Sequence, residues 1–393
     1  MESVSNYQAY KDAIKKTGFV LENRVAQLLK ASGWTVISNK YYEDDYSNTV
    51  REVDLIAYKV SHVQHFDVYT TLVISCKKSE ENVWALLARD INLKDPNADW
   101  WPMHAWSNDP ALQYRLAEPN CAKAYHAAAQ SFGVVQALSV PDVEVFAFQE
   151  LSKAAEITSV TRKQTHGSGS TKLASSPKND VAIFSAITSL MKAQAYELGS
   201  LPNRKKKPSL YQFNLLAVAD TELLRLHFRG SDIECAEIDS EHYVGRYIIH
   251  RKETFSRIRF IRASAFESTL QDYGRLHDAN AKWVADECDS FYRDIVQDDR
   301  RLNALLPTFR NEVRSFIRWK SVSEAGVHVD METATLSYSK KEKKLLIHTD
   351  FGLEIDAPDK FNQSKAIKER VSKALEKVYR YEGAFEFIDD IPF

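Results

Sequence analysis

The sequence predicts an α/β protein with an α+β region at its C-terminal end. Apolar residues recur at helical spacing over residues 7–32, and three stretches rich in Val, Ile, Thr and Tyr follow at 34–39, 50–58 and 68–77. A helix followed by three strands favours one helix packed on a mixed sheet. Near the other end of the chain, a short β meander at 327–356 precedes a charged helix, and together they form the second region.

The stretch between these regions alternates between helical and strand patterns. We expect helices at 80–94, 119–132 and about 180–198, and strands at 143–148, at 211–219 and within 223–265. Residues 157–180 are polar and rich in Gly and Ser, which predicts a mobile loop. We therefore expect a first domain over 1–265, an accessory region over 266–382 and an acidic-aromatic tail over 383–393.

Composition excludes several classes of protein. The chain of 393 residues has 52 Lys and Arg against 54 Asp and Glu, a formal net charge of −2. A protein that coats nucleic acid by bulk charge is excluded, so any nucleic-acid site must be a local basic patch. The four cysteines form no CxxC pair, and no apolar run reaches the length of a membrane helix. We expect a cytoplasmic protein with reduced thiols and no membrane association.

Four polar residues interrupt the apolar elements of the first domain in a definite order. Glu22 shares the apolar side of the first helix with Val25, and Asp54 lies within the strand REVDLIAYK. Ser75 and Lys77 end the next strand and share one face, because side chains alternate along a strand. If the two strands pair, Asp54, Ser75 and Lys77 converge at one end of the sheet, and Glu22 reaches them from the helix.

This set of residues indicates metal-assisted hydrolysis of phosphodiesters. Carboxylate oxygens bind Mg²⁺ (or Mn²⁺) together with water and the substrate phosphate. The metal generates hydroxide and stabilises the charge of the transition state. A lysine beside it can orient the attacking water or neutralise the developing charge.

The order of these motifs resembles the PD-(D/E)xK restriction-endonuclease-like superfamily. The resemblance implies an αβββαβ core over roughly residues 10–80, extending loosely to about residue 265. It implies that Asp54 binds the metal, that Lys77 is the catalytic lysine and that Glu22 is the helix acid. It also implies that Cys76 lends a main-chain carbonyl to the metal, and that cleavage leaves a 5′-phosphate.

The sequence departs from this family at Ser75, where the family has Asp or Glu. A serine hydroxyl binds Mg²⁺ much more weakly than a carboxylate does. Either Glu22, Glu80 or Glu81 supplies the missing charge, or the site is weakened or inactive. A third interpretation is that the acid and the lysine form an ordinary ion pair without catalytic function.

Two further features are candidates for contacts with nucleic acid. The first is a basic run in NRKKKP, which comprises Arg204, Lys205, Lys206 and Lys207. These residues either contact phosphates or, as is more usual for a run of charges, form a solvated loop. The second is a group of tryptophans that includes Trp84 and Trp100. These residues either stack on bases or, as large aromatic side chains usually do, pack in the core.

The chain ends in a peptide that alternates aromatic and acidic residues. Its last five residues are Asp389, Asp390, Ile391, Pro392 and Phe393. They resemble the acidic tip of bacterial single-stranded DNA-binding proteins, which docks enzymes of genome maintenance. The resemblance implies a protein partner that recognises this tip. The alternatives are a chance match and a tail that folds back on its own domain.

Together these features predict a metal-dependent DNA endonuclease. By analogy with proteins of this length and kind, we expect a bacterial anti-phage defence effector. Two alternatives remain open: a catalytically inactive DNA-binding protein of the same fold, and an adaptor that acts through its tail. RNA as the substrate and assembly into a homo-oligomer also remain open.

Overall fold

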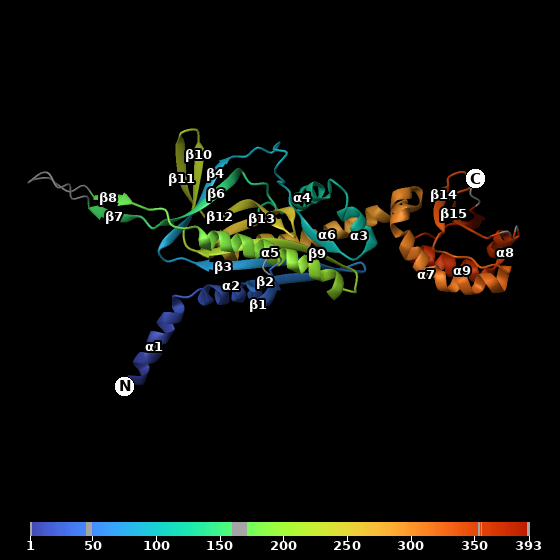
Figure 1. Ribbon diagram of the computed structural model, residues 1–393, viewed down its shortest axis with the longest axis horizontal. Helices are drawn as coiled ribbons and strands as arrows, with labels where there is room; N and C mark the ends of the chain where they lie inside the picture. Colours follow the sequence, from blue (N-terminus) through green and yellow to red (C-terminus); the bar gives the residue numbers. More distant parts are fainter. Residues whose placement is uncertain (1, 45–48, 159–170, 353, 355, 391–393) are drawn as a thin grey trace, which may run out of the picture. The chain divides into compact units, whose positions relative to one another are not determined.

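The computed structural model describes residues 2–44, 49–158, 171–352, 354 and 356–390. The chain divides into two compact units. Unit 1 comprises residues 1–108 and 119–283, and unit 2 comprises residues 109–118 and 284–393. The α/β class with a C-terminal α+β region is confirmed (Figure 1). The boundary expected at residue 265 falls instead within helix α6, Phe266–Tyr292, because a continuous apolar face extends this helix past that point.

The central sheet of unit 1 has the strand order β1-β2-β3-β9-β13-β12, with β5 pairing β9 in addition. Its strands are β1 (Thr35–Glu43), β2 (Val50–Val63), β3 (Phe66–Lys78), β5 (His104–Ser107), β9 (Ser209–Asp220), β12 (Ser240–Ile249) and β13 (Lys252–Arg262). Strands β1, β2 and β3 form an antiparallel meander, and β9 then pairs parallel with β3. The order α2, three strands, α5 and β9 is the predicted αβββαβ order, with other elements inserted between β3 and α5.

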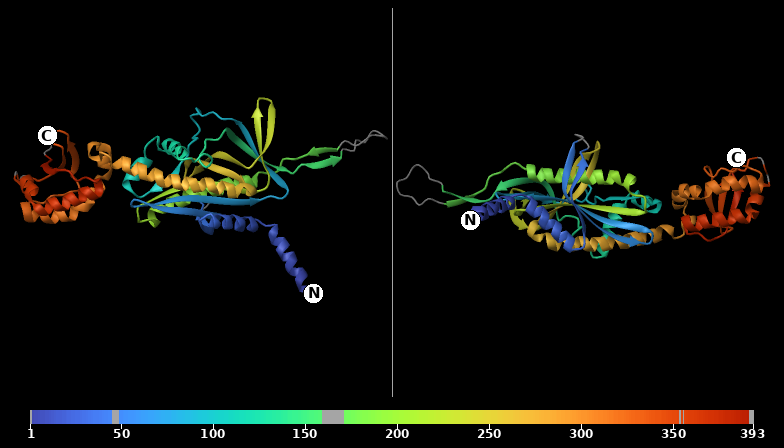
Figure 2. Two further views of the ribbon diagram at one scale, coloured as in Figure 1. Left: turned by 180° about the vertical axis from the view of Figure 1, so that it is seen from behind. Right: turned by 90° about the horizontal axis from the view of Figure 1, so that it is seen from below.

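Helices cover both faces of this sheet (Figure 2). Helix α5 (Val181–Arg204) packs on the face that carries Val73 and Leu215, within one hydrophobic cluster. Helix α2 (Phe19–Ala31) and the first part of α6 lie on the other face. Both edge strands, β1 and β12, contact α5, so the sheet curls around this helix.

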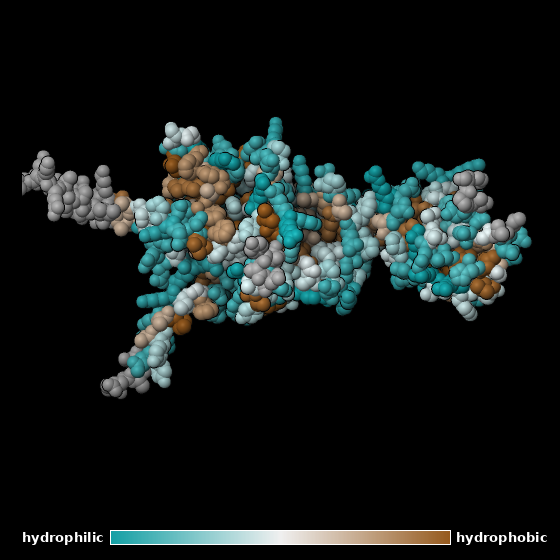
Figure 3. Space-filling view, in the orientation of Figure 1, coloured by the Kyte–Doolittle hydropathy of each residue, from teal (hydrophilic) through white to brown (hydrophobic). Residues whose placement is uncertain are grey.

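A second sheet in unit 1 has the order β11-β10-β4-β6. Its strands are β4 (Asn82–Asp90), β6 (Val143–Ser152), β10 (Leu223–Arg229) and β11 (Asp232–Ile238). Apolar side chains gather on the surface near β10 and β11 (Figure 3). On these strands and on β6, Ile233 and Phe146 are exposed, and the Phe146 and Phe228 rings meet edge to face. The remaining elements of unit 1 are α1 (Glu2–Lys15), α4 (Cys121–Ser131), η1 (Ala263–Ala265) and the paired strands β7 (Ala155–Thr158) and β8 (Thr171–Ala174).

Two expectations about unit 1 were wrong. The helix expected over 7–32 is two helices, because Thr17 and Gly18 favour the helix poorly and the Thr17 hydroxyl donates to the Ile14 carbonyl. The helix expected over 80–94 is strand β4. This strand is buried on both faces, and such a continuous apolar run does not distinguish a strand from a helix. The middle of the predicted loop, residues 159–170, lies outside the described residues.

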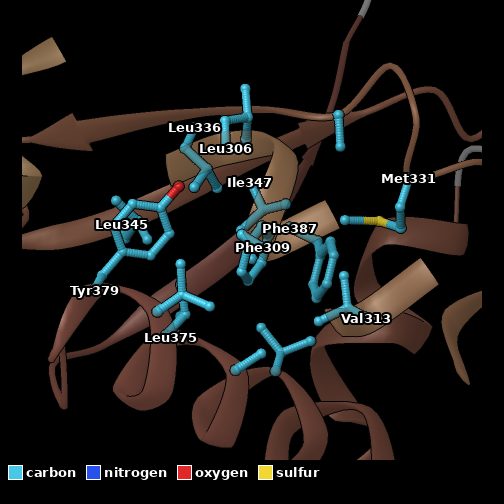
Figure 4. Packing of buried hydrophobic residues seen from close by; sticks show 14 of the residues in the cluster. Leu306, Phe309, Val313, Met331, Leu336, Leu345, Ile347, Leu375, Tyr379 and Phe387 are labelled. Atoms are coloured by element: carbon cyan, nitrogen blue, oxygen red, sulfur yellow. The ribbon is translucent and has the colours of Figure 1, made fainter. Parts of the chain in front are cut away.

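Unit 2 packs helices on a small sheet of order β14-β15-β16. Its elements are α3 (Pro110–Leu116), η2 (Ile295–Gln297), α7 (Asp299–Ala325), β14 (Thr335–Ser339), β15 (Lys344–Thr349), α8 (Ala357–Gln363), α9 (Lys365–Tyr379) and β16 (Phe385–Asp389), together with the end of α6. Figure 4 shows Phe309, Leu375 and Phe387 meeting in the core between α7, α9 and the sheet. In the described part of the chain, no helix is long and apolar enough to cross a membrane.

The expectation of a separate tail over 383–393 was wrong for most of its described residues. Phe385–Asp389 forms β16, which pairs parallel with β15. Phe387 is 1% exposed and belongs to the core of unit 2. Burial of this aromatic side chain stabilises the strand in the sheet, so the tail folds back on its own unit at least as far as Asp390, whose N–H donates to the Thr349 carbonyl.

Candidate functional site

The candidate site lies where the pairing between β2 and β3 stops. The last paired residues at this end are Leu55 and Ile74. Beyond this pair, the main-chain N–H of Cys76 donates to the Asp54 carboxylate and not to a carbonyl of β2. The Asp54 Oδ2 accepts the Cys76 N–H at 2.6 Å and the Ser75 hydroxyl at 3.2 Å. On the other side of β3 the parallel pairing with β9 continues to Lys78. The carboxylate is therefore held in place by a strand that is itself fixed by the sheet.

The structure brings Asp54, Ser75 and Lys77 together on one face of the sheet. Asp54 lies opposite Ser75 when the register of the β2–β3 pair is continued by one residue, and Lys77 follows two residues later. The Lys77 Nζ is 4.0 Å from the Asp54 Oδ2. Both side chains keep contact with solvent, with 29% of Lys77 and 21% of Asp54 exposed. Among the described residues, no hydrogen bond involves the second oxygen of Asp54, Oδ1.

Glu22 lies on helix α2, on the face of the sheet opposite α5, and among the described residues no hydrogen bond or ion pair joins it to Asp54, Ser75 or Lys77. Partial burial raises the pKa of the Glu22 carboxyl, and the negative charges of Asp54 and Glu52 raise it further. The positive charge of Lys77 acts in the opposite direction. The charge of Glu22 is therefore coupled to the charges of Asp54 and Lys77.

Cys76 contacts Asp54 through its main chain and not through its thiol. Burial raises the pKa of the Cys76 thiol well above its ordinary value, and the charges of Asp54 and Glu22 add to the effect. The thiol is therefore protonated at neutral pH. The N–H and C=O of one strand residue point to the same edge, so the Cys76 carbonyl faces the side on which its N–H meets Asp54.

The group opens into a cleft of about 600 Å³ between the sheet and the first half of α5, which we call the Asp54 cleft. Lys77 and Asp54 form part of its wall, and so does Glu52. Glu52 precedes Asp54 by two residues and shares its face, about 7 Å away along the strand. Glu52 was not among the site residues predicted from the sequence, although the alternation in REVD places both carboxylates on one face.

An ion-pair network around the buried Asp44 forms another wall of this cleft. Asp44, which is 2% exposed, accepts from Lys192 of α5 and from Arg51 of β2, each at 2.8 Å. The Asp44 carboxylate thus pairs with two cations and joins the edge of the sheet to the middle of α5. The network keeps the side chains of Lys192 and Arg51 in the wall of the cleft, and neither residue was predicted from the sequence.

The predicted basic run lies at the other end of the sheet. Arg204 pairs with Glu197 at 2.7 Å, and the Lys205 Nζ lies over the stacked rings of Tyr69 and Tyr211. Tyr69 precedes Lys77 by eight residues on β3, a distance of about 26 Å along the strand. Lys206 and Lys207 are exposed. The structure therefore does not bring these four residues to the Asp54 cleft.

The other sequence candidates also have defined places. Trp84 and Trp100 are 0% and 5% exposed, so they pack in the core and do not form a stacking surface. Glu80 is exposed and pairs with Lys78 at 2.7 Å, outside the wall of the Asp54 cleft. In unit 2, Asp389 accepts the Phe351 N–H at 3.2 Å. Ile391, Pro392 and Phe393 lie outside the described residues.

The residues of the Asp54 cleft fit a magnesium ion with several water ligands. Mg²⁺ usually takes one or two protein carboxylates and keeps several waters. Asp54 Oδ1 and Glu52 offer two carboxylates, and the Cys76 carbonyl offers a third oxygen. In the part of the chain that the structure describes, no three His, Cys, Asp or Glu side chains form a group that could hold a metal.

Comparison with known proteins gives no relative for this chain. No protein-family model matches it, and no curated protein or solved structure is significantly similar to it.

Proposed function

We propose that this protein is a metal-dependent endonuclease that hydrolyses phosphodiester bonds of DNA at the Asp54 cleft. The observation that carries the proposal is the convergence of Asp54, Ser75 and Lys77 at the open end of the β2–β3 pair. An acid and a lysine on adjacent strands, next to a cleft with a second carboxylate, are the groups that this reaction needs. A role in bacterial anti-phage defence remains a prediction from analogy.

Asp54, Glu52 and the Cys76 carbonyl would hold Mg²⁺ (or Mn²⁺), with Glu22 contributing through water. A bound Mg²⁺ supplies a hydroxide nucleophile at neutral pH and neutralises charge on the phosphate. The Cys76 N–H and the Ser75 hydroxyl fix one oxygen of Asp54, and so direct the other oxygen towards the cleft. The structure thus provides an oriented carboxylate before any ligand binds.

Lys77 acts on the reacting groups directly. Its ammonium donates a hydrogen bond to the attacking water or to a non-bridging phosphate oxygen. The water oxygen forms the new bond to phosphorus in line with the bond that breaks, which joins phosphorus to the 3′ oxygen. The products are a 5′-phosphate and a 3′-hydroxyl, as the resemblance to the PD-(D/E)xK family implies.

A plasmid-cleavage assay with three variants tests this proposal. Asp54→Asn and Lys77→Ala should each lower the cleavage rate by about 100-fold or more, since removal of one strongly stabilising group costs on the order of 10²–10³ in rate. Lys206→Ala is the matched control, because it removes one positive charge at the other end of the sheet. Cleavage that persists in EDTA, or in both site variants, would exclude the proposed mechanism.

The assignment of Glu52 has its own test. Glu52→Gln should weaken binding of Mn²⁺, measured by calorimetry, while Glu80→Gln should not. Both variants remove one carboxylate and both side chains are exposed. Equal affinities for wild type and Glu52→Gln would leave Asp54 as the only carboxylate ligand from β2.

A DNA-binding protein without catalytic activity is the second candidate function. The observation that favours it is Ser75, whose hydroxyl donates to Asp54 and offers no carboxylate to a metal. In that case wild-type protein binds DNA, cleaves none with Mg²⁺ or Mn²⁺, and has the same affinity for DNA as Lys77→Ala.

A further inference from the structure

A second cleft adjoins the Asp54 cleft and reaches the turn of the β12–β13 hairpin. This hairpin cleft has a volume of about 1090 Å³. Lys192 and Tyr247 line both clefts, so the two share a wall. The other side chains of the hairpin cleft include Arg246, His250 and Arg251. A ligand that leaves the candidate site along this wall therefore meets the hairpin next.

The hairpin ends in three consecutive basic residues: His250, Arg251 and Lys252. Ile249 pairs with Lys252, so His250 and Arg251 form a two-residue turn. All three residues are exposed, and among the described residues Arg251 and Lys252 make no ion pair. Glu253 is the acidic residue in the wall of this cleft, and it pairs with Arg246 at 2.5 Å. The tip of the hairpin thus presents positive charge that the protein does not neutralise.

The backbone conformation of the turn is one that His and Arg rarely adopt. His250 and Arg251 both have positive φ, at 49° and 62°. A turn with two positive φ values favours Asn-Gly, because a side chain in this region costs on the order of 1 kcal/mol per residue. Strain of this kind at exposed charged residues points to a function of their side chains.

We propose that duplex DNA extends from the Asp54 cleft across the hairpin cleft, with its phosphates contacting Arg251 and Lys252 at the turn and Arg246 on β12. The proposal rests on the proposed function and names the surface that positions its substrate. Arg and Lys side chains that contact phosphates bring affinity without reading sequence. The shared wall at Lys192 gives the DNA a continuous path to Asp54 and Lys77. In this arrangement the hairpin, and not the basic run at 204–207, binds the phosphate backbone of the DNA.

The decisive experiment measures binding of the full chain to a fluorescein-labelled 20-bp duplex in EDTA, where no hydrolysis occurs. The double variant His250→Asn/Arg251→Gly fits the turn and removes the Arg251 charge. It should raise the dissociation constant roughly fivefold and lower the slope of log affinity against log salt by about 1. The double variant should also raise the melting temperature, because it relieves the backbone strain of the turn.

Two controls separate this role from a general effect of charge. Lys206→Ala/Lys207→Ala removes two positive charges at the far end of the sheet and should leave the affinity unchanged. Arg251→Lys keeps the charge and should keep the affinity. The proposal is overturned if wild type does not bind the duplex, if the double variant binds as wild type does, or if the 206/207 variant loses more affinity than the hairpin variant.

These outcomes differ from those that test the proposed function. Hairpin-dependent binding without any cleavage would retain the DNA surface and exclude the endonuclease. Cleavage that depends on Asp54, combined with unchanged binding by the hairpin variant, would retain the endonuclease and exclude this surface.

Discussion

At the scale of single residues, the hydrogen bonds of Asp54 decide what the site can do. One oxygen of its carboxylate accepts from the Cys76 main chain and from the Ser75 hydroxyl. Ser75 is 2% exposed, so its hydroxyl works without competition from bulk water. Ser75, which stands where the PD-(D/E)xK pattern has an acid, therefore supports Asp54 in this structure. An acid in its place would face Asp54 with a like charge in the absence of metal.

Replacement of Ser75 by Ala tests this supporting role. The variant loses one hydrogen bond to a carboxylate, worth about 1 kcal/mol, so the single-turnover cleavage rate should fall by roughly fivefold. The Cys76 N–H still holds the same oxygen, so the loss should be much smaller than that of Asp54→Asn. A rate for Ser75→Ala as low as that of Asp54→Asn would make Ser75 a catalytic group.

Glu22 gives a prediction about stability and pH. Burial and nearby carboxylates raise the pKa of Glu22 in the folded state. The folded state therefore binds more protons than the unfolded state, and this residue lowers stability as pH rises above its unfolded pKa. Glu22→Gln should raise the melting temperature of the metal-free protein at pH 7. The difference should vanish below about pH 4, where the carboxyl is protonated in both states.

At the scale of elements, three histidines with lowered pKa make unit 1 sensitive to acid. His104 lies on β5, His126 on α4 and His242 on β12; His126 and His242 are buried and His104 is half-buried. Burial lowers the pKa of each; for His126 the value falls to about 4, with the charge of Arg257 contributing. Such groups are neutral in the folded state and charge only on unfolding as pH falls.

The free energy of unfolding should therefore decrease as pH falls from about 6.5 towards 4. Each of these histidines contributes up to about 1.4 kcal/mol per pH unit in that window. Denaturant unfolding of wild type and His126→Gln at pH 7 and pH 5 measures the effect, and the variant should lose less stability between the two. His62→Gln is the control, because the His62 side chain is 68% exposed. Equal losses for wild type and His126→Gln would contradict the prediction.

The strands that the sequence predicts well are rich in β-branched residues. Val, Ile and Thr recur along β2 and β3, and their sharing of a face brings Asp54, Ser75 and Lys77 together as expected. Strand β4 was mistaken for a helix because both its faces are buried and its apolar run is rich in Leu and Ala, which favour helices. Lys192 and the hairpin tip were not selected, because their proximity to the site depends on the curling of the sheet around α5. That curvature is a tertiary property which local patterns do not encode.

At the scale of the whole molecule, the two units have separate cores and separate candidate functions. The Asp54 cleft lies entirely in unit 1, and the end of the chain lies in unit 2. The sequence did not predict that residues 109–118 belong to unit 2, because a segment that joins a distant part of the chain carries no local signal of it. It also did not predict that Phe387 would be a core residue, since alternation with acids made the tail look exposed.

The predicted protein-binding tip can be tested without damage to unit 2. Deletion of residues 391–393 leaves β16 and the hydrogen bonds of Asp389 and Asp390 intact. The melting temperature of this deletion variant should equal that of wild type. Its binding to a protein that recognises the C-terminal tip of single-stranded DNA-binding proteins should be lost. Phe387→Ala should instead destabilise unit 2 by about 3–5 kcal/mol. A deletion that keeps full binding to such a partner would exclude the tip as its recognition site.

The most direct test of the central claim is the single-turnover cleavage rate of a labelled DNA duplex by the full chain, measured with Mg²⁺ and with EDTA, for wild type and Lys77→Ala. Lys77 lies in the cleft beside Asp54, and its side chain is partly exposed, so its truncation should leave the fold intact; circular dichroism checks this. We predict cleavage by wild type with Mg²⁺ alone and a rate at least about 100-fold lower for Lys77→Ala. Equal rates for the two proteins, or cleavage by wild type in EDTA, would contradict a metal-dependent nuclease site at Asp54 and Lys77.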